Sequence, residues 1–143
     1  MELKVITPAT AVTMRLIKSE DLNHHGTLFA GRTAEWFVES GFIAATSLLK
    51  PQNVVCLKIH GMYFTKPAKS GDVLKFSSKV VYAGKSSLTA YVHVEKNGSD
   101  ILLVDGFITH LIWPSSIPEP SAFTLICASV SGTCFTHAII FTV

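Results

Sequence analysis

Residues 24–36, HHGTLFAGRTAEW, place several chemically capable groups at the start of an apolar segment. Two adjacent histidines and Gly26 lead through Gly31 to Glu35. Such a stretch could be a catalytic site, a phosphate cradle, a metal site or a well-capped helix start. Adjacent histidines do not easily share one metal ion, and no Glu or Cys completes a set at metal spacing, so we expect no metal site. The first amides of a helix that begins here could instead bind a developing oxyanion.

Glu35 and Glu39 are the carboxylates of this segment. They are four residues apart, so on a helix both face similar surroundings. A carboxylate held on an otherwise apolar helix suits a general base, or a nucleophile, that acts at a carbonyl carbon. The structural alternative is a hydrogen bond or an ion pair at an interface, for which Arg32 is an available partner, three residues before Glu35.

The loop before the helix offers further polar groups at Asn23, His24 and His25. An asparagine cannot act as a base, but its amide can orient a water molecule or hold a carbonyl group. The alternative for Asn23 is capping of the loop's own turn. For the two histidines, hydrogen bonds within the loop compete with a role in moving protons. The sequence GKSS at residues 84–87 is no P-loop, because it lacks the preceding glycine pattern and joins two predicted strands.

Periodicity predicts the elements that hold these groups. After Thr27 the apolar residues follow helical spacing, which predicts one long helix from about Phe29 to Leu49, ending before Pro51. Its apolar residues nearly encircle it, so we expect burial on most sides. An α+β fold, with a sheet wrapped around the helix, follows from the order of one strand, the helix and four antiparallel strands. The predicted strands are residues 4–18, 54–64, 73–83, 88–96 and 101–113, with the hairpin turn NGSD before the last.

Composition limits the classes of function. The 143 residues suit one domain, and 48% hydrophobic against 15% charged residues predicts a subunit interface and a homo-oligomer, at least a dimer. The net charge of +2, without a basic run, gives no indication of a nucleic-acid partner. Cys56, Cys127 and Cys134 lack close spacing, and the first residues lack the apolar core of a signal peptide. We therefore expect reduced thiols and a cytoplasmic location.

The C-terminal segment, residues 114–143, differs from the rest. Residues 114–121, PSSIPEPS, have the composition of a linker, and residues 122–143 carry no charge. The uncharged segment is long enough to cross a bilayer, but no Lys or Arg flanks it, so we expect no membrane anchor. Its hydroxyl-bearing and β-branched residues favour two short strands or a packed tail, and cover for a neighbouring subunit is the alternative.

Two stretches resemble a known family. Residues 23–45, NHHGTLFAGRTAEWFVESGFIAA, are similar without a gap to the loop and central helix of hotdog-fold acyl-CoA thioesterases, in the acyl-CoA hydrolase branch. Residues 54–87 resemble the strands that follow, and together the matches cover about residues 4–113. The resemblance implies a hotdog domain over residues 1–113, an antiparallel sheet around one central helix. It also implies hydrolysis of an acyl-CoA to free acid and CoA, with no cofactor apart from the CoA of the substrate.

The resemblance also implies roles for residues of the site. The backbone amides of Ala30 and Gly31 would supply the oxyanion donors at the helix start. The turn at residues 84–87 lies near the CoA nucleotide in the family, where Lys85 and two serine hydroxyls could hold phosphate; a simple hairpin turn is the alternative. The candidate substrate-binding residues are therefore His24, His25, Gly26, Lys66, Gly84, Lys85, Ser86 and Ser87.

Val38 departs from the family pattern, because the family carries its catalytic carboxylate at this position. Glu39 is adjacent, and we take it as the base or water-positioning group, with Asn23 assisting across the cleft and Glu35 in reserve. The rotation of about 100° per helical residue opposes Glu39. Val38 favours a second hypothesis, a non-catalytic acyl-CoA-binding hotdog protein. A hotdog dehydratase, which would need a catalytic histidine in the loop, ranks third.

Overall fold

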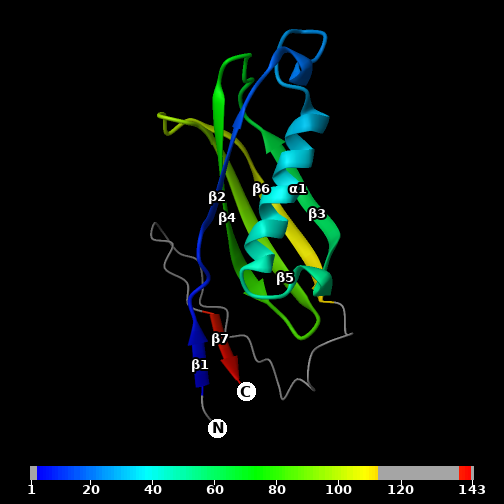
Figure 1. The fold of residues 1–143 in the computed structure, drawn as a ribbon, viewed down its shortest axis with the longest axis vertical. Helices are drawn as coiled ribbons and strands as arrows, with labels where there is room; N and C mark the ends of the chain where they lie inside the picture. Colours follow the sequence, from blue (N-terminus) through cyan, green and yellow to red (C-terminus); the bar gives the residue numbers. More distant parts are fainter. Residues whose placement is uncertain (1–2, 113–138, 143) are drawn as a thin grey trace.

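Residues 3–112 and 139–142 are described by the computed structural model, in which one helix packs against a five-stranded antiparallel sheet (Figure 1). The strand order is β2-β4-β5-β6-β3. This architecture confirms the predicted hotdog fold. The elements of this unit are β2 (Ala11–Leu16), the 3-10 turn η1 (Ser19–Asp21), α1 (Ala30–Thr46), the 3-10 turn η2 (Pro51–Asn53), β3 (Val54–Phe64), β4 (Val73–Ala83), β5 (Ser87–Lys96) and β6 (Leu102–Ile112).

The central helix α1 begins one residue after the predicted start and ends three residues before the predicted end. Its last turn is closed by hydroxyl groups, since Thr46 Oγ1 and Ser47 Oγ donate to the carbonyls of Ile43 and Ala44 at 2.9 and 2.7 Å. Such bonds satisfy carbonyl groups that a helix end leaves without partners. The helix thus ends before Pro51 with carbonyls of its last turn bound by neighbouring hydroxyl groups.

Small residues let α1 lie close to the sheet. Phe37, Ala44 and Ala45 are fully buried on its inner side. At Gly41 a Cβ atom would come within 2.7 Å of Ile108 Cδ1, so a larger residue there would require the end of the Ile108 side chain to move. Within one chain only this inner side is buried, whereas Glu35, Glu39 and Ile43 are exposed. The expectation of burial on most sides is thus met on the sheet side alone.

The predicted N-terminal strand is divided into two. β1 (Leu3–Ile6) pairs antiparallel with β7 (Ile139–Thr142) in a separate two-stranded sheet, and β2 joins the main sheet beside β4. The tail was predicted to form two short strands or a packed segment. One strand, β7, is described, and the rest of this prediction falls on residues 113–138, which lie outside the described residues. Of the helices in the described part of the chain, none combines the length and apolar character needed to span a membrane.

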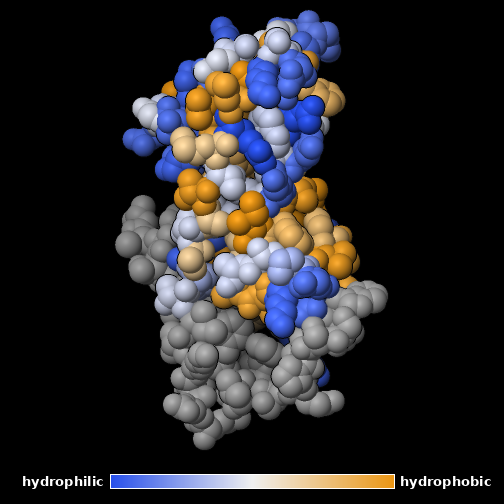
Figure 2. All heavy atoms as spheres, viewed as in Figure 1, coloured by the Kyte–Doolittle hydropathy of each residue, from blue (hydrophilic) through white to orange (hydrophobic). Residues whose placement is uncertain are grey.

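The edge strand β3 is unusual because nearly all of it is exposed. Val55, Leu57 and Tyr63 retain 49%, 61% and 73% of their surface, although the strand is eleven residues long. Apolar side chains on the helix-side face gather over α1 and toward β3 (Figure 2). A long edge strand with free backbone groups and apolar side chains is a template for pairing with another chain.

His110 is a buried histidine in the core between α1 and the sheet. Its side chain is 0% exposed, and within residues 3–112 and 139–142 neither ring nitrogen has a hydrogen-bond partner. The ring of Phe42 lies 6.1 Å away, and Cys56 is the opposite residue on β3. Burial lowers the pKa of His110, because the charged imidazolium loses its hydration.

We predict that His110 makes the folded chain sensitive to acid. Because the folded pKa is lowered, the unfolded chain binds more protons below its own pKa of about 6.5, so stability falls as the pH drops below that value. Thermal unfolding of wild type should show a lower Tm at pH 5 than at pH 7.5, and His110→Leu should reduce this difference. His24→Gln, at an exposed histidine, is the control. An unchanged pH dependence in His110→Leu would contradict the prediction.

Candidate active site

A cavity of ≈ 330 Å³ lies at the start of α1. The helix contributes Ala30 and Thr33, and the preceding loop contributes Asn23 and Leu28. The remaining wall comes from the end of β3, the segment after it and the starts of β4 and β6. Those residues are Phe64, Thr65, Lys66, Pro67, Ala68, Leu74, Leu103 and Val104. The cavity therefore has apolar walls and a helix N-terminus at one side.

The first turn of α1 carries backbone donors at the edge of this cavity. Ala30 lines the cavity itself, whereas Gly31 and Arg32 line a second cavity together with Asp21, Phe29 and Glu35. The amide of Phe29 is bound to the carbonyl of Asp21 at 2.9 Å, and helical bonding resumes with Thr33, which donates to the carbonyl of Phe29. Helix geometry leaves the amides between them, at Ala30, Gly31 and Arg32, without acceptors inside the helix. With the positive end of the helix dipole, these amides favour an oxygen that gains negative charge.

Asn23 lines the cavity and also holds its own loop. Its Oδ1 accepts hydrogen bonds from the amides of His25 and Thr27 at 2.9 and 3.2 Å, and its Nδ2 donates to Thr27 Oγ1 at 3.0 Å. Gly26 closes the turn with a φ of 74°, in the left-handed region that suits glycine. The exposed rings of His24 and His25 lie 3.9 Å apart and do not line the cavity.

Both candidate carboxylates are paired with arginines. Glu39 forms an ion pair with Arg15 on β2, and Glu35 Oε2 accepts a hydrogen bond from Arg32 Nη1 at 2.8 Å. The ion pair with Arg15 shows that Glu39 faces the β2 side of the helix. Among the residues that the structure describes, no Asp or Glu lines the cavity.

Val38 lies on the other flank of the helix. Phe42, one turn further along, packs near His110 of β6, so this flank faces β6 and β3. Val38 itself is half-buried against the core. One residue of helical rotation, about 100°, thus separates the family's carboxylate position from Glu39.

The candidate phosphate-binding turn is far from the cavity within one chain. Gly84 donates to the carbonyl of Ser87 at 2.7 Å, and Ser86 accepts from the amide of Ile112 at 2.8 Å. This hairpin therefore joins β4 to β5 beside the last residue of β6, at the end of the sheet where α1 ends. Lys66, by contrast, is at the cavity. The structure thus separates Lys85, Ser86 and Ser87 from Asn23 and Ala30.

Some cavity residues were not singled out from the sequence. Thr33 is buried, and its hydroxyl donates to the carbonyl of Phe29 at 3.3 Å, so it supports the helix start beside the cavity. Its place three residues after Ala30, on the same helix face, is a signal that the sequence does contain. Phe64, Leu103 and Val104 give no such signal, because only the pairing of β3 with β6 brings them together.

Comparison with known proteins identifies the family. The model of the thioesterase superfamily matches residues 25–102, more than half of the chain, so the chain belongs to the thioesterase superfamily. No curated protein matches.

Solved structures agree with this assignment. The acyl-CoA hydrolase from Staphylococcus aureus, in complex with butyryl coenzyme A, is 27% identical over 74% of this chain, with a TM-score of 0.68. The match covers 66% of the hydrolase, so this chain spans less than two thirds of its length. A hexameric acyl-CoA thioesterase is 28% identical over 78% of this chain and 74% of its own, with a TM-score of 0.67. Zebrafish thioesterase superfamily member 2, at 20% identity over 77% of this chain and 80% of its own, has a TM-score of 0.67 and shares the fold.

Proposed function

We propose that this protein binds acyl-CoA at the start of α1 and hydrolyses the thioester to free acid and CoA. The observation that carries the proposal is the cavity whose wall includes the first turn of α1. A thioester carbonyl in this cavity could direct its oxygen at the amides of Ala30 and Gly31, which stabilise the oxyanion of the tetrahedral intermediate. The ring of Phe29 fills the space that a side chain at Gly31 would take, since a Cβ there would lie 2.4 Å from Phe29 Cε1, so this ring would have to move for a substrate to reach the Gly31 amide.

The same cavity suits the other parts of such a substrate. Leu28, Phe64 and Leu103 offer apolar surface for an acyl chain, and Lys66 offers a cation at the cavity wall. Water would attack the carbonyl carbon and the CoA thiolate would leave, a reaction that needs no metal and no further cofactor. Asn23 would hold the carbonyl or orient the water. The cytoplasmic location expected from the sequence stays a prediction.

Glu39 remains our first candidate for the base, with Glu35 in reserve. Glu39 is held by an ion pair with Arg15 on the surface. This ion pair would have to open before Glu39 could reach a water molecule near the substrate. Glu39→Gln should lower kcat on the order of 10²-fold, as loss of an acid–base group commonly does. Steady-state kinetics over short, medium and long acyl-CoAs would measure this, with Glu20→Gln as an exposed control. Full activity in Glu39→Gln, with loss in Glu35→Gln, would transfer the role to Glu35.

A second candidate function is binding of acyl-CoA without hydrolysis, and Val38 favours it. Three Staphylococcus aureus hydrolase structures are of variants in which an asparagine, an aspartate or a threonine is replaced by alanine. In that protein the aspartate follows the asparagine by fifteen residues, and the threonine follows the aspartate by seventeen. Counted from Asn23, the same spacing leads to Val38 and Val55, two apolar residues.

Val38→Asp separates the two functions. If the chain binds without hydrolysis, wild type should bind butyryl-CoA in calorimetry without releasing CoA, and Val38→Asp should introduce measurable turnover. Val38→Asn is the matched control, because asparagine has the size of aspartate but no charge. This variant should stay inactive, since an amide cannot accept the proton. Turnover by wild type that Glu39→Gln abolishes would instead establish hydrolysis through Glu39.

We further propose that the working form is a homo-oligomer, at least a dimer, built through β3. Pairing of two copies of β3 in an antiparallel manner about a two-fold axis would bring opposite ends of the two chains together. The turn at residues 84–87 of a second copy would then approach the cavity, although it is remote within one chain. Lys85 and the two serines could there bind phosphates of CoA.

Charge placed on β3 tests this assembly. Leu57→Lys should shift the chain toward monomer in sedimentation velocity at micromolar concentration, because it puts a cation in an apolar contact. Val12→Lys is the matched control, since Val12 is 52% exposed on the opposite edge strand against 61% for Leu57. Lys85→Gln should raise KM for acyl-CoA while leaving kcat unchanged. A stable folded monomer of wild type would refute the proposal.

A further inference from the structure

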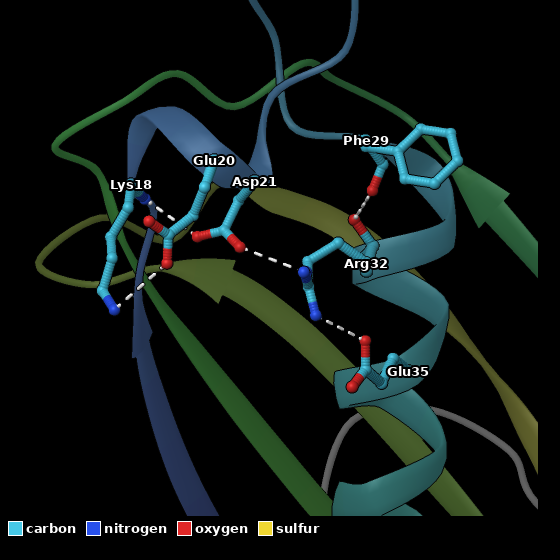
Figure 3. Close-up of polar contacts among 7 residues, drawn as sticks. Lys18, Glu20, Asp21, Phe29, Arg32 and Glu35 are labelled. Carbon is cyan, nitrogen blue, oxygen red and sulfur yellow. Dashed lines mark hydrogen bonds and ion pairs between the residues drawn. The ribbon is translucent and has the colours of Figure 1, made fainter.

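Asp21 joins the loop before α1 to the helix itself (Figure 3). Its side chain is only 7% exposed. Asp21 Oδ2 accepts the amide of Lys18 at 2.9 Å, and Oδ1 lies 3.1 Å from Arg32 Nε. Its backbone carbonyl accepts the amide of Phe29, the residue that precedes the helix. One residue therefore ties the 3-10 turn η1 to the first turn of α1 through both side chain and backbone.

The position of Arg32 in the first helical turn is unfavourable with respect to the helix dipole, and its pair with Glu35 three residues later offsets this only in part. A cation near a helix N-terminus opposes the dipole, and the first turn of α1 carries no acidic residue to offset it. The guanidinium instead lies between two carboxylates, with Nε toward Asp21 and Nη1 toward Glu35. Figure 3 shows Arg32 extending from the helix toward Asp21. Its position is explained by the connection that it makes.

The ion pair between Asp21 and Arg32 lies next to both parts of the proposed site, namely Asn23 and the amides of Ala30 and Gly31. Asn23 follows Asp21 by two residues, and its loop returns through a bridge between Leu22 and Leu28. The donor amides of Ala30 and Gly31 follow directly after Phe29. Asn23 and these amides thus belong to two segments that Asp21 connects, in addition to the bridge between Leu22 and Leu28.

We propose that Asp21 and Arg32 are positioning residues, whose ion pair keeps Asn23 aligned with the oxyanion amides at the start of α1. This inference rests on the proposed hydrolysis at that site. Neither side chain touches the reacting atoms; each acts through the segment it holds. A buried carboxylate that loses its cationic partner is destabilised, so loss of Arg32 leaves the Asp21 side chain held only by the amide of Lys18.

The test combines kinetics with amide hydrogen exchange on the full chain. Asp21→Asn and Arg32→Gln should each lower kcat on the order of 10- to 100-fold, since small misplacement of catalytic groups has effects of this size. KM should change by less than about threefold, because alignment acts mainly in the transition state. The double variant should be no slower than either single variant, as expected for residues that act as a unit.

Two variants control for loop charge and for folding. Glu20→Gln alters the same turn, where Glu20 is exposed and lies 3.5 Å from Lys18 Nζ, and should keep wild-type kcat. Arg32→Lys retains the cation and should recover most of the turnover lost in Arg32→Gln. Hydrogen exchange should rise over residues 22–31 in Asp21→Asn and Arg32→Gln, while β4 and β5 stay protected.

The outcomes separate this inference from the proposed function. If wild type hydrolyses acyl-CoA and both Asp21→Asn and Arg32→Gln keep its kcat, the positioning role is wrong and hydrolysis stands. A loss of activity that merely parallels a loss of Tm, without faster exchange over residues 22–31, would also overturn it. If wild type hydrolyses no acyl-CoA, the positioning role fails together with hydrolysis.

Discussion

The close contact between α1 and the sheet is the constraint on which the rest of the structure depends. Gly41 allows the helix to approach Ile108, and Gly106 allows Phe37 to lie over the sheet, where a Cβ would come within 3.1 Å of Phe37 Cζ. A Cβ at Gly106 would also come within 2.2 Å of the carbonyl of Gly61 on β3. A larger residue at Gly106 would disturb both the pairing of β6 with β3 and the seat of Phe37, whereas one at Gly41 would first displace the end of the Ile108 side chain. The depth at which the helix sits fixes where the first amides of α1 meet the cavity.

The same contact fixes the rotation of the helix about its axis. It therefore also fixes which flank of the helix carries Val38 and which carries Glu39. Turning α1 by one residue, to bring Glu39 to the flank of Val38, would carry Phe37 and Ala44 out of the core. Exposing one large apolar side chain alone costs about 1.5–3 kcal/mol. Glu39 can therefore act only from the flank that faces β2, where Arg15 already holds it. This geometry supports the second candidate function, binding of acyl-CoA without hydrolysis.

In the single chain, apolar side chains of β3 and of one flank of α1 stay exposed or half-buried. This exposure agrees with the high hydrophobic content of the sequence. Among the described strands, β3 pairs only with β6 and carries apolar side chains on its surface, and the neighbouring flank of α1 carries Phe42 and Val38, both half-buried. In the proposed dimer, a second copy would cover these groups. It would also offer the phosphate-binding candidates to a cavity that, in one chain, lacks them. Burial of apolar surface and completion of the site would then be one event.

The sequence by itself determined the elements of this protein. The helix was predicted within one residue of its start at Ala30, and the four strands after it within one residue at each end. These features depend on residues close together in the chain, such as the apolar period and the NGSD turn, so local physics specifies them. The resemblance of residues 23–45 to the family added the fold for the same reason, because it lies in one continuous stretch.

Only the tertiary structure decided how distant residues meet. It placed Glu39 beside Arg15 of β2, and it separated residues 84–87 from the cavity, whereas the pair of Glu35 with Arg32 is local and was available from the sequence. It also divided the predicted N-terminal strand and paired its first part with residues 139–142. Each outcome depends on which strand lies next to which and on the rotation of one helix against the sheet. Those are set by packing between residues far apart in the chain, and a local pattern does not contain that information.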